Sequence, residues 1–120
     1  MDIDMNTPLL VTAGCIGLVT ALAHGYLGET RLLGVVKLDS AIGKRALRAV
    51  FHLSTFYWFV GALVLLAAPF FFEPFTGRLL ALVVAFLYIA GAIGNFWLAR
   101  GKHIGWALLL LAAVLASAGA

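Results

Sequence analysis

The chain has 120 residues, of which 64% are hydrophobic and only 11% charged, and its formal net charge is +3. Soluble domains contain roughly 45–50% apolar and about 25% charged residues. The mean hydropathy of +1.10 therefore excludes a soluble enzyme and a disordered tail, and a single cysteine, Cys15, excludes a disulfide scaffold within the chain. The composition indicates a polytopic membrane protein.

Four apolar segments are long enough to cross a bilayer as helices. A spanning helix needs roughly 20 mostly apolar residues, and in lipid its backbone groups must be satisfied within the segment. The predicted spans are residues 8–27, 49–68, 79–98 and 104–120. The sequence therefore predicts an all-α, four-helix transmembrane bundle, a single domain over residues 1–120 with cytoplasmic loops at 28–48 and 99–103.

The connections between these spans contain local start and stop signals. Gly25 and Gly28 permit a left-handed helix cap, which predicts that the first helix stops at this point. Asp39 or Ser40 is a suitable N-cap for a helix that leads into the second span. The phenylalanine-rich segment 69–78 is expected to form an outer loop that anchors the protein at the membrane interface.

Lysine and arginine residues concentrate on one side of this arrangement. The loops before the second and fourth spans contain seven of them: Arg31, Lys37, Lys44, Arg45, Arg48, Arg100 and Lys102. The opposite side has only Arg78. The positive-inside rule places the seven in the cytoplasm, so both termini are expected in the periplasm of a bacterium and the protein in the inner membrane.

The basic residues next to the second span are expected to serve the membrane. Lys44, Arg45 and Arg48 lie just outside the predicted span, where we expect contact with anionic lipid headgroups. Nucleic acid is excluded as a partner, since it requires a larger basic surface than these short loops offer.

Small residues form a stripe along the first span. Ala13, Gly17, Ala21 and Gly25 recur every four residues and would let another helix approach closely. Packing inside the bundle is the favoured interpretation, and a homo-oligomer or a larger membrane complex is the alternative. In the third span, Asn95 is expected to hydrogen-bond across helices.

Each of the three histidines lies at the end of a span, on the predicted cytoplasmic side. His24 comes five residues before Glu29, His52 comes four after Arg48, and His103 follows Lys102 directly, next to the start of the fourth span. Three imidazoles from three helices therefore share one depth. Glu29 follows a helix whose dipole disfavours a carboxylate, so it is expected to pair with a cation: an arginine such as Arg31, a metal ion or a protonated histidine.

Several interpretations of this cluster stay open. His24, His52 and His103 with Glu29 would suit zinc, iron or another divalent metal, and two of the imidazoles could instead ligate a haem iron. Separate interfacial hydrogen bonds with no ligand, or a proton or quinone role, are the alternatives. No residue pattern indicates catalysis, because the hydroxyls of Ser54 and Thr55 are expected to bond back to their helix.

Three segments resemble a pattern found in a family of small uncharacterised bacterial four-span membrane proteins. They are residues 23–33, with His24 and Glu29, residues 51–55, with His52, and residues 100–106, with His103 and Trp106. The resemblance implies the four-span fold and the inner-membrane location, and it supplies no activity. We expect a non-enzymatic accessory or ligand-binding subunit; the alternatives are a structural partner of a larger membrane complex or a proton-coupled small-molecule carrier.

Overall fold

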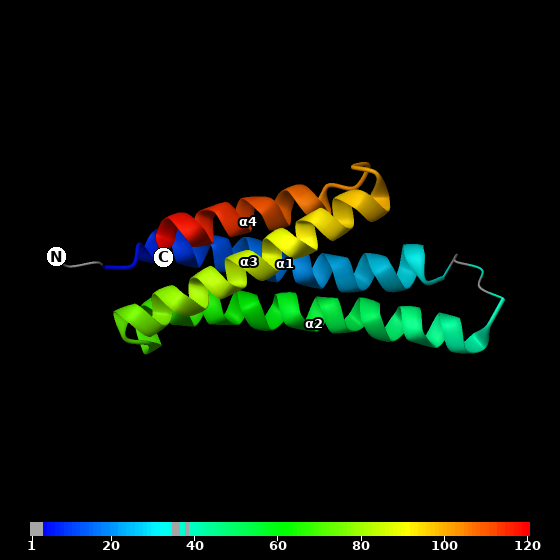
Figure 1. Ribbon diagram of the computed structural model, residues 1–120, viewed down its shortest axis with the longest axis horizontal. Helices are drawn as coiled ribbons and strands as arrows, with labels where there is room; N and C mark the ends of the chain where they lie inside the picture. The colour runs from blue at the N-terminus through cyan, green and yellow to red at the C-terminus, as the bar shows by residue number, and fades with distance from the viewer. Residues whose placement is uncertain (1–3, 35–36, 38) are drawn as a thin grey trace.

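A computed structural model describes residues 4–34, 37 and 39–120, and these form an all-α structure (Figure 1). Its elements are α1 (Thr7–Leu27), continued by the π-helix η1 (Gly28–Leu32), then α2 (Ala41–Phe71), α3 (Pro74–Ala99) and α4 (Gly105–Gly119). The first residues of the chain and residues 35, 36 and 38 of the predicted 28–48 loop lie outside the described part. The expected helical bundle is confirmed.

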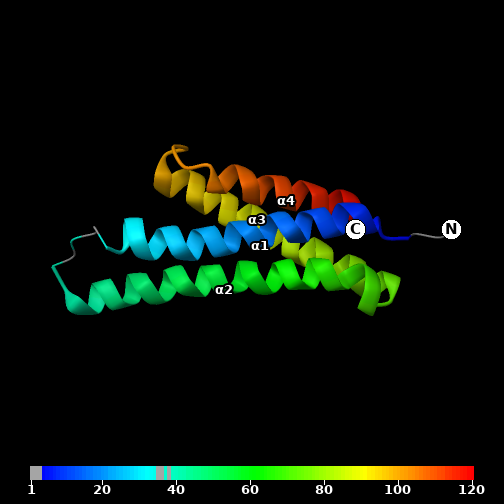
Figure 2. The same ribbon diagram turned by 180° about the vertical axis from the view of Figure 1, so that it is seen from behind.

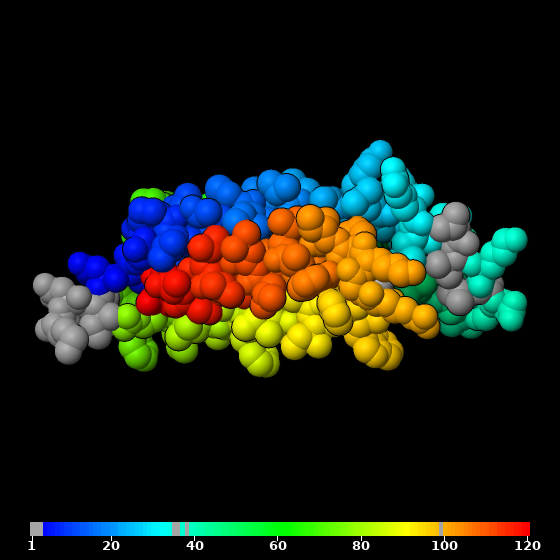
Figure 3. Space-filling model, turned by 90° about the horizontal axis from the view of Figure 1, so that it is seen from above, coloured from blue at the N-terminus to red at the C-terminus, as the bar shows by residue number. Residues whose placement is uncertain are grey.

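The helices form an elongated antiparallel bundle, 59 × 24 × 18 Å in extent. α1 packs against α2 and α4, and α3 packs against the same two helices (Figures 1 and 2). The space-filling view shows α1 and α4 in contact along one face (Figure 3). The start of α1 and the end of α4 lie at the same end of the bundle as the α2–α3 turn, and there the Asn6 N–H donates to the Gly119 carbonyl oxygen at 2.8 Å.

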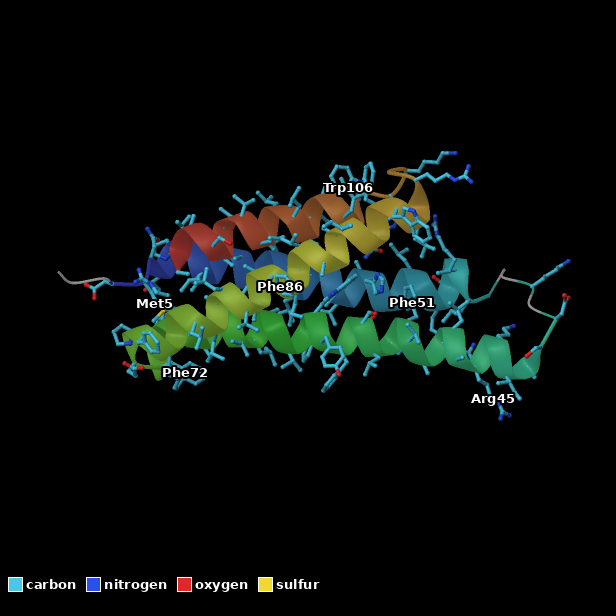
Figure 4. The ribbon with its side chains drawn as sticks, in the orientation of Figure 1. Met5, Arg45, Phe51, Phe72, Phe86 and Trp106 are labelled. Carbon is cyan, nitrogen blue, oxygen red and sulfur yellow. The ribbon has the colours of Figure 1, made fainter. Side chains whose placement is uncertain are left out.

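Three of the helical segments are long and apolar enough to cross a membrane: α1 with η1, α2 and α3. Their exposed apolar side chains indicate contact with a lipid bilayer. The 15 residues of α4 rise only about 22 Å, whereas the 31 residues of α2 rise about 46 Å. The first turns of α2 extend past the other helices, and Arg45 lies there (Figure 4).

The seven basic residues of the predicted cytoplasmic loops gather at one end of the bundle. They belong to η1, the following connection, the start of α2 and the α3–α4 turn. This end is called the basic end below. At the opposite end, the Arg78 guanidinium donates to the Ala120 carbonyl oxygen at 3.4 Å. The seven-to-one distribution along the sequence is thus also a separation in space.

The structure corrects the predicted end of the second helix and the predicted start of the third. The segment 69–78 is not a loop, because α2 continues through Pro69 to Phe71 and α3 begins at Pro74, leaving a two-residue turn. Pro74 suits the first turn of a helix, where its missing N–H has no partner to lose.

The predicted N-cap at Ser40 is confirmed, since the Gly43 N–H donates to Ser40 Oγ at 2.9 Å.

The expected left-handed stop at Gly28 is wrong. Gly28 has φ −62° and ψ −47°, which is right-handed helical backbone, and the chain continues as η1. A Cβ at Gly28 would overlap the ring of Phe51 on α2. The glycine therefore lets the Phe51 ring approach the α1 backbone, and it does not serve to reverse the chain.

Small residues of α1 pack inside the bundle, as favoured above. A Cβ at Gly17 would overlap Tyr88 of α3, and one at Gly25 would lie 3.0 Å from Thr55 Cγ2 of α2. Ala13 and Ala21, the other two members of the stripe, are fully buried. The stripe is therefore covered by the chain's own helices. Cys15, by contrast, is on the exposed surface of α1.

Candidate functional site

The imidazole of His24 contacts two aromatic rings of α2. It stacks on Phe51, with ring centroids 4.0 Å apart and planes 7° apart, and its centroid lies 4.3 Å from that of Trp58. Phe51 lies in the half of the bundle nearest the basic end (Figure 4). These two contacts restrict the orientation of the ring, so its nitrogen atoms have a defined direction.

One nitrogen of this ring is left without a partner. His24 Nε2 is buried and makes no hydrogen bond with any residue in the described part of the chain. Buried polar atoms nearly always have a partner, because an unsatisfied one costs roughly 1–3 kcal/mol. Water, an ion or another ligand at Nε2 would remove that cost.

A cavity of about 90 Å³ adjoins His24 between α1, α3 and α4. Most of its wall is apolar, and its polar lining residues are Thr20, His24, Asn95 and His103. Since a liquid water molecule occupies about 30 Å³, the space suits a few waters or one ion with bound water. A haem macrocycle does not fit without displacing the surrounding side chains.

Asn95 does not make the expected bond across helices. Its Nδ2 donates to the carbonyl oxygen of Gly91 in the same helix, at 2.8 Å. A polar side chain in a helix can satisfy itself on the preceding turn, which is what Asn95 does here. Ser54 and Thr55 behave in the same way, as expected, with bonds to Val50 and Phe51.

His103 reaches the cavity from the α3–α4 turn. Its Nδ1 accepts the N–H of Gly105 at 3.1 Å, at the start of α4. Because Nδ1 acts as an acceptor, a neutral His103 ring carries its proton on Nε2. The side chain is exposed overall while still lining the cavity, so it lies between His24 and the outside.

His52 is not among the residues that line the His24 cavity. Its Nε2 is 3.3 Å from Glu29 Oε1, and Nε of Arg48 is also 3.3 Å from that oxygen. Glu29 thus has the cationic partner it was expected to need, but the arginine is Arg48 and not Arg31. Arg48 and His52 are four residues apart on α2 and share a helix face, a spacing from which this pair could have been predicted.

The structure therefore divides the predicted histidine cluster in two. His24 and His103 line one cavity, whereas His52 pairs with Glu29 outside it. Over residues 4–34, 37 and 39–120, no three His, Cys, Asp or Glu side chains are grouped so as to hold a metal ion. A metal site in this arrangement would use the two cavity histidines and water.

Comparison with known proteins adds no relative: no protein-family model, curated protein or solved structure matches the chain. The resemblance of its three motif segments to a four-span family stays a prediction.

Proposed function

We propose that the chain is a small, non-enzymatic subunit of the bacterial inner membrane that binds a divalent transition-metal ion at the His24–His103 cavity. The unpaired, buried Nε2 of His24 is the observation that carries this proposal. A second imidazole at the same cavity favours a borderline metal such as zinc. Water completes the coordination, as at other zinc sites with an open position.

The coordination changes the hydrogen bonding of His103. The metal needs a nitrogen lone pair, and Nδ1 of His103 is engaged with Gly105. Binding through Nε2 moves the ring proton to Nδ1 and ends the bond from the Gly105 N–H. Zinc binding therefore has a spectroscopic signature at His103 that a merely structural histidine does not show.

Zinc titration of the purified protein in detergent tests the proposal. Calorimetry is expected to show binding by the wild type that His24→Ala and His103→Ala abolish. His52→Ala is the matched control, and it retains binding because His52 pairs with Glu29 outside the cavity. Nitrogen-15 NMR is expected to report the change of tautomer at His103 on addition of zinc.

Four results would contradict this assignment. Binding that survives His24→Ala excludes the cavity, and loss of binding in His52→Ala restores the three-histidine site of the sequence interpretation. An absorbance Soret band in the purified protein identifies haem. Absence of zinc binding by the wild type would also contradict the proposal, and the alternative of a structural partner in a larger membrane complex would then be favoured.

The proposed topology has four spans and both termini in the periplasm. It is supported by the seven basic residues at one end and Arg78 at the other, and by the antiparallel course of α4 beside α3. Reporters that are active only in the periplasm are expected to work when fused after Ala120 or within residues 72–76, and to fail near Lys44. A cytoplasmic C-terminus would contradict it.

A further inference from the structure

The C-terminal end of α3 has an unusual backbone. Arg100 caps the helix with φ 53° and ψ 37°, and no other non-glycine residue in the described ranges has a positive φ. Left-handed backbone costs a side chain roughly 1–2 kcal/mol, which is why glycine is usual at such a cap. The chain instead places an arginine there and a glycine, Gly101, one residue later.

The turn that holds Arg100 is well fixed. The Gly101 N–H donates to the Phe96 carbonyl oxygen at 2.9 Å, and Trp106 Nε1 on α4 donates to the Gly101 carbonyl oxygen at 3.4 Å. The rings of Phe96 and Trp106 meet edge to face, with centroids 5.0 Å apart. The strained arginine therefore keeps a defined position.

An open hollow of about 530 Å³ lies beside this turn, lined by Phe96, Trp97, Leu98 and Arg100. Trp97 and Leu98 are 79% and 70% exposed. Because α3 is long and apolar enough to cross a membrane, its end lies at the boundary between hydrocarbon and headgroups. Tryptophan is enriched at that depth.

The charged residues of the α3–α4 turn are all basic. Residues 99–105 contain Arg100 and Lys102 and no acidic residue, and Lys102 is exposed. Glu29, at the same end of the bundle, is paired with Arg48 and His52. Basic side chains project outward from the α3–α4 turn (Figure 4). A second copy of this turn would be repelled, whereas an anion is attracted.

The geometry points to a binding site for an anionic phospholipid, whose phosphate contacts the guanidinium of Arg100 and whose glycerol and first acyl carbons lie against Trp97 and Leu98. Arginine suits a phosphate because its planar donors meet two oxygens at once. The site is separate from the His24 cavity, and it accounts for an arginine at a position where backbone geometry favours glycine.

Spin-labelled lipids test this site in bilayers that contain the whole protein. Electron paramagnetic resonance measures the immobilised fractions of phosphatidylglycerol and phosphatidylcholine. Wild type is expected to prefer phosphatidylglycerol, and Arg100→Gln is expected to reduce the preference about fivefold, the factor for one basic residue at an anionic surface. Arg78→Gln, which removes the arginine at the opposite end of the bundle, where its guanidinium donates to the Ala120 carbonyl oxygen, is the matched control.

Arg100→Gly provides an independent check. It relieves the left-handed backbone, so thermal stability in detergent is expected to stay equal or rise while lipid preference falls. An unchanged preference in Arg100→Gln, or an equal loss in Arg78→Gln, would overturn the site in favour of diffuse attraction. Release of the lipid by equimolar glycerol phosphate would also overturn it, since a headgroup alone makes no contact with Trp97.

Discussion

The hydroxyl of Tyr88 donates a hydrogen bond to the carbonyl oxygen of Trp58 at 2.8 Å, and it lies against Gly17. Tyr88 is the largest fully buried side chain in the described part of the chain. One phenol thus connects three helices, because Tyr88 is on α3, Trp58 on α2 and Gly17 on α1. The Trp58 side chain in turn supports the ring of His24.

Gly17→Ala is expected to destabilise the bundle by about 1–3 kcal/mol, the usual cost of overpacking. The new methyl group would overlap the Tyr88 hydroxyl. Unfolding in mixed micelles measures the change. Gly94→Ala is the control, since a Cβ there meets nothing within 4 Å. Equal stability of the two variants would show that Tyr88 does not occupy this place.

Gly28→Ala is expected to weaken the His24 site as well as the fold. A methyl group at Gly28 would displace the ring of Phe51, on which His24 stacks. We expect a loss of about 1–3 kcal/mol and reduced zinc binding. Phe51→Ala removes the ring that the methyl group would meet, so Gly28→Ala should cost less stability in a Phe51→Ala background than in the wild type. An equal cost in both backgrounds would argue against the close approach of α1 and α2.

The stabilisation of the α3 N-terminus by the Glu73 carboxylate is expected to depend on pH. Hydrogen bonds from the Thr76 hydroxyl and then the Thr76 N–H lower the pKa of the Glu73 carboxyl below its ordinary value of 4.5. Since the folded state binds this proton less readily, the stabilisation is complete above pH 4.5 and is lost as pH falls through the lower, folded pKa. A carbon-13 NMR titration measures it, and Thr76→Ala should move the pKa back up.

Glu29→Gln is expected to change the free energy of unfolding by less than about 1 kcal/mol, the usual value of exposed ion pairs. The side chains of Glu29, Arg48 and His52 are 41–53% exposed, so solvent screens their attraction. Unfolding at low and high salt measures the effect. A loss well above that, insensitive to salt, would mean that the three side chains are dry in the membrane.

The predicted spans agree with α1, α2 and α3 because helix formation in lipid depends on local apolar length, which can be counted. The same count predicts a span at residues 104–120. The helix α4 has only 15 residues, however, and that it crosses the membrane stays a prediction. Helix ends were predicted less well. The N-cap at Ser40 could be predicted from the chemistry of its own side chain. The role of Gly28 depends on the ring of Phe51, which lies 23 positions later in the sequence.

The position of each histidine along its helix could be predicted from the sequence, but the direction in which its ring points could not. Distance from the charged loops gives the level of a histidine in the membrane, while the rotation of its helix is set by packing. His52 and His24 therefore share a level and face different neighbours: Glu29 for His52, and Phe51 and Trp58 for His24. The buried position of Tyr88 has no local signal in the sequence, because it depends on Gly17 of another helix, against which the Tyr88 hydroxyl lies.

The short α4 gives the molecule an uneven hydrophobic thickness. A hydrocarbon core of about 30 Å exceeds the ~22 Å rise of α4, while α2 is longer than the core. Bilayers respond to such mismatch by thinning beside the short segment. In the proposed four-span topology, lipid next to α4 would be drawn inward at the α3–α4 turn, which brings headgroups and water toward His103, and thick bilayers would disfavour the protein.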